Sequence, residues 1–171
     1  AEEHCRFVKP IVGFDPEAIP DRGTLRAKLE LPEEDKLFLA TIGPEGDYGL
    51  RISAIEGAFE SLKKEFPDSY FIVVCPGAGT RDWIRYHRFL DDLYEYFAAS
   101  DLVITQSGYG KIAELSALGI PFIAIPLDYH FEQEYVMSHR LDHYRTGKLV
   151  TIRDHRPGDI ADIGRRLLAS E

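Results

Sequence analysis

The stretch SDLVITQSGYGKIAELSALGIPFIAIPLDYHFEQ, residues 100–133, determines the fold of this chain more than any other. It predicts a strand over residues 102–105, a Ser-Gly turn, a helix over about 110–118 and a second strand over 122–125. A Gly-Ile-Pro connector separates the helix from the second strand, and a polar loop that ends at Gln133 follows. A strand, a helix and a strand in this order are typical of parallel β-sheets.

The turn between the first strand and the helix consists of small residues. Backbone N–H groups at such a turn have no helical partners, and the helix dipole favours negative charge there. Glu114 lies one turn into the helix among apolar neighbours. A phosphate-sized anion site with a carboxylate beside it suits a nucleotide, because N–H groups bind the diphosphate and the carboxylate accepts from the ribose hydroxyls.

The same alternation of strands and helices extends over most of the chain. Further strands are expected at residues 36–42, 70–75 and 148–152, and further helices at 24–31, 50–66, 91–99, 132–141 and 157–169. Residues 80–89 give no clear prediction. The expected fold class is therefore α/β, a doubly wound parallel sheet of Rossmann-like type, with ligands at the carboxyl ends of the strands.

Length and composition exclude several classes of protein. The 171 residues suffice for one domain, or for part of a larger protein, and 44% of them are apolar. The net charge of −9, with Lys and Arg scattered among acids, argues against extended nucleic-acid binding. The sequence shows no apolar run of membrane-spanning length and no leader-like start. Cys5 and Cys75 do not have a metal-binding spacing, so a reduced, cytoplasmic setting is expected.

A series of short motifs in residues 99–135 carries a specific resemblance. The series consists of Ala99-Ser100-Asp101 before a strand, Ser107-Gly108, Glu114, Gly119-Ile120-Pro121, Pro126, and the loop from His130 to Gln133. It resembles the nucleotide-sugar-binding half of a GT-B glycosyltransferase. The match is strongest to the family 28 C-terminal domain of the bacterial peptidoglycan-precursor N-acetylglucosaminyltransferases. The chain departs from that pattern in lacking an Asn soon after Gln133, and in having GPEGDYG where the family has a Gly-Gly-Ser type of loop.

The resemblance implies roles for residues around the helix that contains Glu114. Glu114 would accept hydrogen bonds from the ribose diol. Ser107 and Gly108, with the backbone N–H groups of Tyr109 and Gly110, would hold the diphosphate. The reaction would then be transfer of a sugar from a UDP-sugar with inversion, UDP-N-acetylglucosamine being one candidate donor. No metal and no cofactor other than the UDP-sugar substrate are expected, because the N–H groups and the helix dipole neutralise the departing diphosphate.

The resemblance also implies contacts from other loops. Gln133, with His130 or the backbone of Phe131 nearby, would face the donor sugar or a phosphate. Gly43 would let the first loop approach the ligand closely, and the uracil would lie near residues 76–79.

A GT-B enzyme needs a second domain for the acceptor. Residues 1–24, which are rich in Pro and Gly, resemble the interdomain linker, and residues 25–171 would form the donor domain. The catalytic base would lie mostly on the acceptor domain or subunit, which would also provide any peripheral contact with a membrane.

Less specific interpretations remain open. Glu114 could simply pair with Lys111, Ser107-Gly108 could be an ordinary turn, and Gln133 could cap a helix. The chain could also be a nucleotide-sugar-binding subunit that docks on a membrane partner, or one half of a sugar-nucleotide epimerase. A further alternative is a nucleotide-sensing module without catalytic activity.

Overall fold

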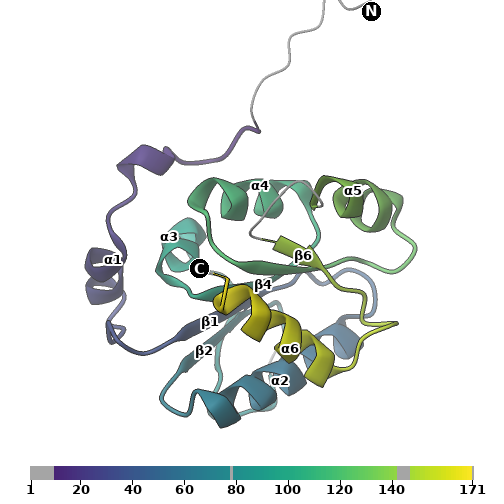
Figure 1. The fold of residues 1–171 in the computed structure, drawn as a ribbon, viewed down its shortest axis with the longest axis horizontal. Helices are drawn as coiled ribbons and strands as arrows, with labels where there is room; N and C mark the ends of the chain where they lie inside the picture. The colour runs from purple at the N-terminus through teal and green to yellow at the C-terminus, as the bar shows by residue number, and fades with distance from the viewer. Residues whose placement is uncertain (1–9, 78, 142–146, 171) are drawn as a thin grey trace, which may run out of the picture.

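The chain folds around one parallel β-sheet with helices on both faces. The computed structural model describes residues 10–77, 79–141 and 147–170, so Cys5 and the first part of the predicted linker lie outside the described residues. The six strands run parallel in the order β3-β2-β1-β4-β5-β6 (Figure 1). Their bounds are β1 Leu37–Thr41, β2 Tyr70–Val74, β3 Arg85–His87, β4 Leu102–Gln106, β5 Phe122–Ile125 and β6 Gly147–Leu149. This arrangement confirms the predicted doubly wound, Rossmann-like α/β fold.

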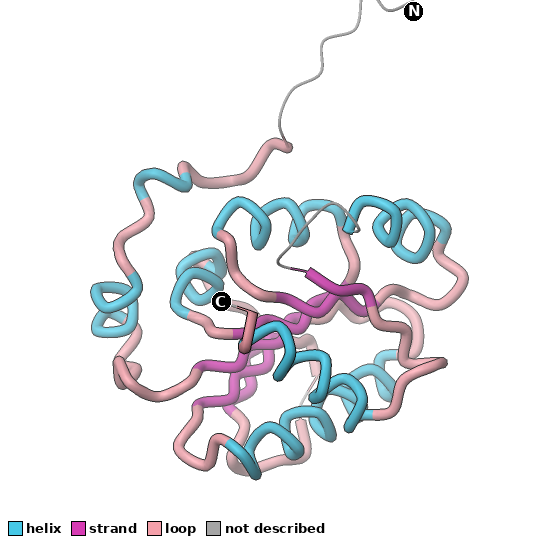
Figure 2. The backbone as a smooth tube through the Cα atoms, in the orientation of Figure 1, coloured by secondary structure: helices cyan, strands magenta, loops and turns pink. Residues whose placement is uncertain are grey.

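Two groups of helices cover the two faces of the sheet (Figures 1 and 2). One face carries α2 (Tyr48–Glu65) and α6 (Pro157–Leu168), and the other carries α1 (Arg22–Lys28), α3 (Leu93–Ala99), α4 (Tyr109–Leu118) and α5 (Met137–Leu141). Successive side chains of β1 alternate between the two cores: Phe38 belongs to the first and Leu39 to the second. Both are fully buried, as expected for a parallel strand covered on both sides. No helix within the described ranges is long and apolar enough to cross a membrane.

The edge strand β3 was not predicted. Arg85–His87 has no buried apolar residue, and its backbone pairs with Ile72–Val74 of β2 on one side only. A short edge strand needs no apolar alternation, so its sequence carries no strand pattern.

Most other elements differ from the predicted bounds by one or two residues, and three of the differences are informative. Helix α1 begins at Arg22 rather than near residue 24, because the Asp21 side chain accepts a hydrogen bond from Thr24 N at 3.0 Å and caps the helix. Strand β6 ends at Leu149, before the predicted end at residue 152. The predicted helix 132–141 begins as a π-helical turn, η3 (Glu132–Val136), before it continues as α5.

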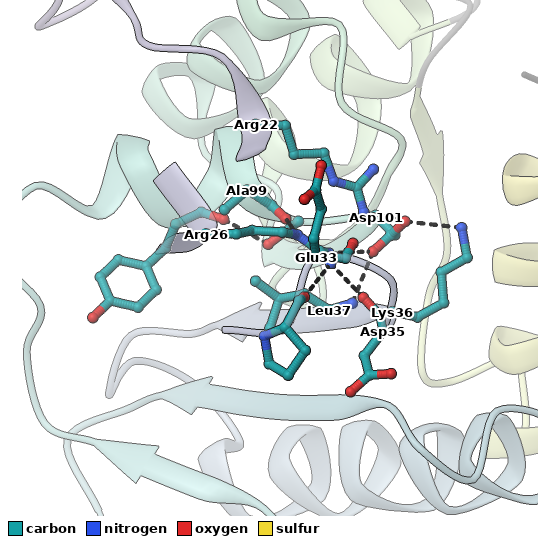
Figure 3. A network of polar contacts seen from close by, with 11 residues as sticks. Arg22, Arg26, Glu33, Asp35, Lys36, Leu37, Ala99 and Asp101 are labelled. Atoms are coloured by element: carbon teal, nitrogen blue, oxygen red, sulfur yellow. Dashed lines mark hydrogen bonds and ion pairs between the residues drawn. The ribbon is translucent and has the colours of Figure 1, made fainter. Parts of the chain in front are cut away.

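A buried ionic network fixes α1 at the amino-terminal edge of the sheet (Figure 3). Arg26 is 1% exposed and donates to the Asp101 carboxylate at 2.8 Å. It also donates to the backbone carbonyls of four residues, Ala99, Pro32, Glu33 and Asp35. Asp101 in turn accepts from Arg22, Lys36 and the backbone N–H of Leu37. These contacts join α1, the start of β1 and the start of β4.

Candidate functional site

A cleft opens at the carboxyl ends of β1, β2 and β4. Its volume is about 670 Å³, and Thr41, Ile42, Val74, Cys75, Thr105 and Gln106 line it from these three strand ends. The order of the strands reverses between β1 and β4, which are neighbours in the sheet but are not consecutive in sequence. Ligands of open α/β sheets bind at such a switch point. The fold therefore places a cavity of ligand size where the strand order predicts one.

The loop between β1 and α2 forms one wall. Gly43, Pro44 and Glu45 line the cleft. A Cβ atom at Gly43 would lie 2.1 Å from Oε2 of Glu45 and 3.2 Å from Oε1 of Gln106. The absence of a side chain at Gly43 therefore lets this loop approach the end of β4, while the predicted close approach of Gly43 to a ligand stays a prediction.

The first turns of α4 form another wall of the cleft. Gly108, Lys111 and Glu114 line the cleft. Gly108 is the N-cap residue and provides no side-chain cap, whereas Asp21 caps α1. No hydrogen bond from the backbone N–H groups of residues 109–111 to another described residue is present. This end of α4 therefore offers unpaired donors and the positive end of a helix dipole.

Glu114 projects its carboxylate from this wall. Its Oε2 accepts a hydrogen bond from Lys111 Nζ at 3.0 Å, and the side chain is 21% exposed. Lys111 Nζ also lies 5.5 Å from the centre of the Phe97 ring. An ion pair at this spacing contributes only about 0.2–0.5 kcal/mol, so it leaves the carboxylate able to exchange partners.

Ser107 and Gln133 lie behind the wall rather than in the cleft. The Ser107 hydroxyl is buried and donates to the backbone carbonyl of Gln133 at 2.9 Å. The Gln133 side chain is 8% exposed, and its Oε1 accepts from Leu127 N at 3.1 Å. His130 is exposed, and its Nδ1 lies 3.4 Å from Gln133 N. These contacts join the turn after β4 to the loop after β5.

A second set of contacts fixes the outer part of that loop. Glu134 accepts from Tyr129 N at 3.0 Å and from Arg153 Nη2 at 2.6 Å. The hydrogen bond from Arg153 holds the pKa of Glu134 below its usual value. The Arg153 guanidinium also lies 5.3 Å from the centre of the Tyr129 ring, and Tyr129 has a positive φ of 61°. The loop is therefore held in one conformation from both sides.

Aromatic and apolar residues close the remaining side of the cleft. Phe14 stacks on Tyr94 with ring centroids 5.1 Å apart, and both line the cleft together with Phe89. Pro76 from the predicted uracil loop also lines it, whereas Gly77 lies against the Tyr48 ring. The position of a uracil remains a prediction, and this wall offers flat apolar surface for a base.

Of the predicted site residues, the structure brings Gly43, Gly108 and Glu114 into the cleft. Tyr109 and Gly110 are exposed and are not among the residues that line the cleft, and Ser107, His130 and Gln133 belong to the layer behind it. Sequence reasoning missed Gln106 and Arg51. Arg51 falls four residues before Ile55, on the buried stripe of α2, and this spacing is the signal that marks it. In the part of the chain that the structure describes, no group of three His, Cys, Asp or Glu side chains is placed to hold a metal.

Comparisons with known proteins identify the family and the fold of this chain. Residues 58–143, half of the chain, match the family described as "Glycosyltransferase family 28 C-terminal domain". The chain is 32% identical over 132 residues to an uncharacterized glycosyltransferase of Methanopyrus kandleri, covering 74% of this chain and 37% of the relative. It is 33% identical over 127 residues to a UDP-N-acetylglucosamine--N-acetylmuramyl-(pentapeptide) pyrophosphoryl-undecaprenol N-acetylglucosamine transferase of Caldicellulosiruptor saccharolyticus, covering 64% of this chain and 33% of the relative.

Among solved structures, the glycosyltransferase of kitacinnamycin shares the fold, with a TM-score of 0.69 and 17% sequence identity. The match covers 99% of this chain and 42% of that one. The chain thus spans only about a third of the length of these two relatives, 37% of one and 33% of the other.

Proposed function

This chain belongs to the family of glycosyltransferase family 28 C-terminal domains, and from that premise we propose that it binds the sugar-nucleotide donor of a glycosyltransferase in the cleft beside α4. The donor in this proposal is a UDP-sugar. The diphosphate lies at the amino-terminal end of α4, and the ribose lies one turn further along the helix.

One observation carries the proposal: the open end of α4 and the carboxylate of Glu114 face the same cleft. Unpaired N–H groups at a helix start bind phosphate oxygens well. A carboxylate has two acceptor oxygens, which match the two adjacent hydroxyls of a ribose. The hydrogen bond from Lys111 Nζ holds this carboxylate at the cleft before the donor arrives.

The same geometry supports inversion without a metal. Charge develops on the diphosphate as the bond to the anomeric carbon breaks, and preorganised N–H donors stabilise it there. Because the diphosphate occupies one face of the anomeric carbon, an acceptor hydroxyl attacks from the other face and the configuration inverts. The proton of that hydroxyl goes to a base on the acceptor side.

The identity of the sugar rests on a relative. The Caldicellulosiruptor saccharolyticus protein is named as an N-acetylglucosamine transferase that uses UDP-N-acetylglucosamine. We therefore take UDP-N-acetylglucosamine as the first donor to test. In the proposal the loop from His130 to Gln133 stands beside the sugar, with Gln133 acting mainly by holding the loop in place.

The acceptor site belongs to a further domain or to a partner subunit. The chain matches only 37% and 33% of the two relatives, which leaves room in them for a domain of similar size. The catalytic base, the acceptor and any peripheral contact with a membrane lie on that side of the cleft. The donor half described here supplies nucleotide recognition and leaving-group stabilisation.

Calorimetric titration of the chain with UDP, UDP-N-acetylglucosamine, UDP-glucose and GDP-mannose, in EDTA and then in Mg²⁺, tests the proposal. We expect uridine-selective binding that is the same in both buffers. Glu114→Ala removes one charged hydrogen-bond partner and should weaken UDP binding by about 1.5–3 kcal/mol, which is at least tenfold.

Glu60→Ala is the matched control. Glu60 is an exposed carboxylate of α2 that pairs with Arg81 and does not line the cleft. This variant should bind UDP like the native chain. If native binding is absent, or is equal in Glu114→Ala, the proposed donor site is wrong. Binding that appears only with Mg²⁺ would instead contradict the metal-free mechanism.

A further inference from the structure

Arg51 is a buried cation directly behind the first loop of the cleft. Arg51 is 1% exposed, and its guanidinium donates three hydrogen bonds to oxygens around the cleft. Nη2 donates to the carbonyl of Gly43 at 3.2 Å and to the carbonyl of Glu45. Nη1 donates to Oε1 of Gln106 at 3.0 Å. One side chain of α2 therefore contacts both the β1–α2 loop and the end of β4.

Gln106 closes this arrangement into a ring of contacts. Its Oε1 accepts not only from Arg51 but also from the backbone N–H of Gly43 at 3.3 Å. Gly43 and Gln106 both line the cleft, Gly43 just after β1 and Gln106 at the end of the adjacent strand β4. The planar fork of Arg51 thus sets how far apart the glycine loop and the turn before α4 lie.

Within the described ranges, no carboxylate is hydrogen-bonded to Arg51. All three acceptors are neutral oxygens, and its buried Nε has no hydrogen-bond partner among the described residues. Burial lowers the pKa of Arg51, and the more distant carboxylates of Glu45 and Asp47 only partly offset this. Arg26, the other fully buried arginine in the described part of the chain, is paired with Asp101 at 2.8 Å.

A buried cation without a bonded carboxylate is costly unless it interacts with a negative charge. Arg51 contacts the β1–α2 loop and Gln106, and Gln106 leads directly into the turn before α4, where the proposed diphosphate would lie. In a site of low dielectric, a guanidinium behind the loop attracts an anion in front of it even without direct contact.

We propose that Arg51 is a positioning residue for the donor diphosphate: its fork holds the Gly43–Glu45 loop against Gln106, and its buried charge compensates the charge of the bound diphosphate. This inference rests on the proposed function and adds to it a residue that acts through the loop rather than by touching the ligand.

Two substitutions separate positioning from a general role in folding. Arg51→Met keeps the length of the side chain and removes its charge and donors, and Arg51→Lys keeps the charge but loses the fork. Each variant is titrated with UDP and with uridine, which carries the base and ribose but no phosphate. Arg51→Met should weaken UDP binding at least about tenfold and Arg51→Lys about threefold, while uridine binding changes less than about twofold in both.

Several outcomes overturn the inference. Equal losses for uridine and UDP would show a general collapse of the cleft, and unchanged UDP binding in Arg51→Met would remove the role altogether. Circular dichroism and thermal melting identify a variant that does not fold. If Arg51→Met does not fold, the test is made with Arg51→Lys, by comparing its affinity for UDP with its affinity for uridine. A ratio of the two affinities equal to that of the native chain overturns the inference.

A separate probe distinguishes this inference from the proposed function. If the native chain does not bind UDP, the proposed function fails. The role of Arg51 can then be tested alone with inorganic pyrophosphate. The measurement is the rise in the melting temperature of the protein when pyrophosphate is added. A rise in the native chain that is lost in Arg51→Met supports an anion site organised by Arg51, and no rise in the native chain overturns it.

Discussion

Nη2 of Arg26 lies 2.8 Å from Oδ2 of Asp101, and the side chains of both residues are 1% exposed (Figure 3). This pair joins α1 to the first residue before β4, at the edge of the sheet opposite the cleft. A buried pair of this kind is sensitive to the loss of one partner, because the other charge then remains buried alone. Two predictions follow from this pair, and two others from the loop after β5 and the end of α4.

Asp101→Asn should lower the free energy of unfolding by about 3–5 kcal/mol, because it leaves Arg26 without its counter-charge. Chemical denaturation at pH 7 measures the change. Asp162→Asn is the matched control, since Asp162 forms an exposed pair with Arg165 within α6. It should change stability by no more than about 0.5 kcal/mol. Similar values for the two variants would contradict the structural importance of the buried pair.

The effect of Asp101 should depend on pH in a defined direction. Burial alone would raise the pKa of Asp101, but hydrogen bonds from Arg22, Leu37 N and Lys36 outweigh it and hold the pKa below its usual value. A depressed pKa in the folded state stabilises the protein above the unfolded pKa of about 3.9, and this contribution is lost as the pH falls through the folded pKa.

The stability difference between the native chain and Asp101→Asn should therefore be constant near neutral pH and shrink below about pH 4. Denaturation curves of the two chains at matched pH values measure it. A difference that stays constant down to pH 2 would show that the ionised carboxylate is not the stabilising species.

Gln133→Ala should release the loop after β5, because Leu127 N loses its acceptor. Hydrogen exchange of the Leu127 amide, measured without any ligand, should become faster, and stability should fall by about 1–3 kcal/mol. Gln133→Glu retains an acceptor oxygen at the same position and should keep the amide protected. If both variants exchange alike, the side chain of Gln133 does not hold this loop.

Gly119→Ala should destabilise the chain by about 1 kcal/mol, because Gly119 ends α4 with a φ of +70°, where an L side chain is strained. Gly158→Ala is the control within α6, since Gly158 is helical and a Cβ atom there would meet nothing within 4 Å. It should be neutral or stabilising by about 0.5 kcal/mol. Thermal melting of both variants compares the two positions, and equal effects would contradict the backbone argument.

The sheet was predictable because its strands are buried on both faces. β1, β2, β4 and β5 are continuous apolar runs with turn residues after them, and this pattern alone places them in a parallel sheet. β3 escaped prediction because hydrogen bonds to the backbone of β2, and not an apolar pattern, define it. The π-helical start of residues 132–141 was not predicted either, because its buried residue is the polar Gln133 and gives no apolar pattern.

The residues of the candidate site were likewise predictable only where local sequence defines their position. Glu114 and Gly108 were predictable because local sequence places them: a turn, a helix start and one acid on that helix. Arg51 and Gln106 were missed because their contacts link segments 55 residues apart. A charged residue in an amphipathic helix is normally interpreted as exposed, and only its place on the stripe of Ile55 indicates otherwise.

The residues at the two ends of β4 have different structural roles. Asp101, just before the strand, belongs to the ionic network with α1, whereas Gln106 and Gly108 at the other end line the cleft. The strand between them is five residues long, which is about 16 Å. Substitutions at the two ends are therefore expected to act almost additively. For protein engineering this separation means that the cleft loops can be randomised to accept new ligands while the anchoring half of the fold is left untouched.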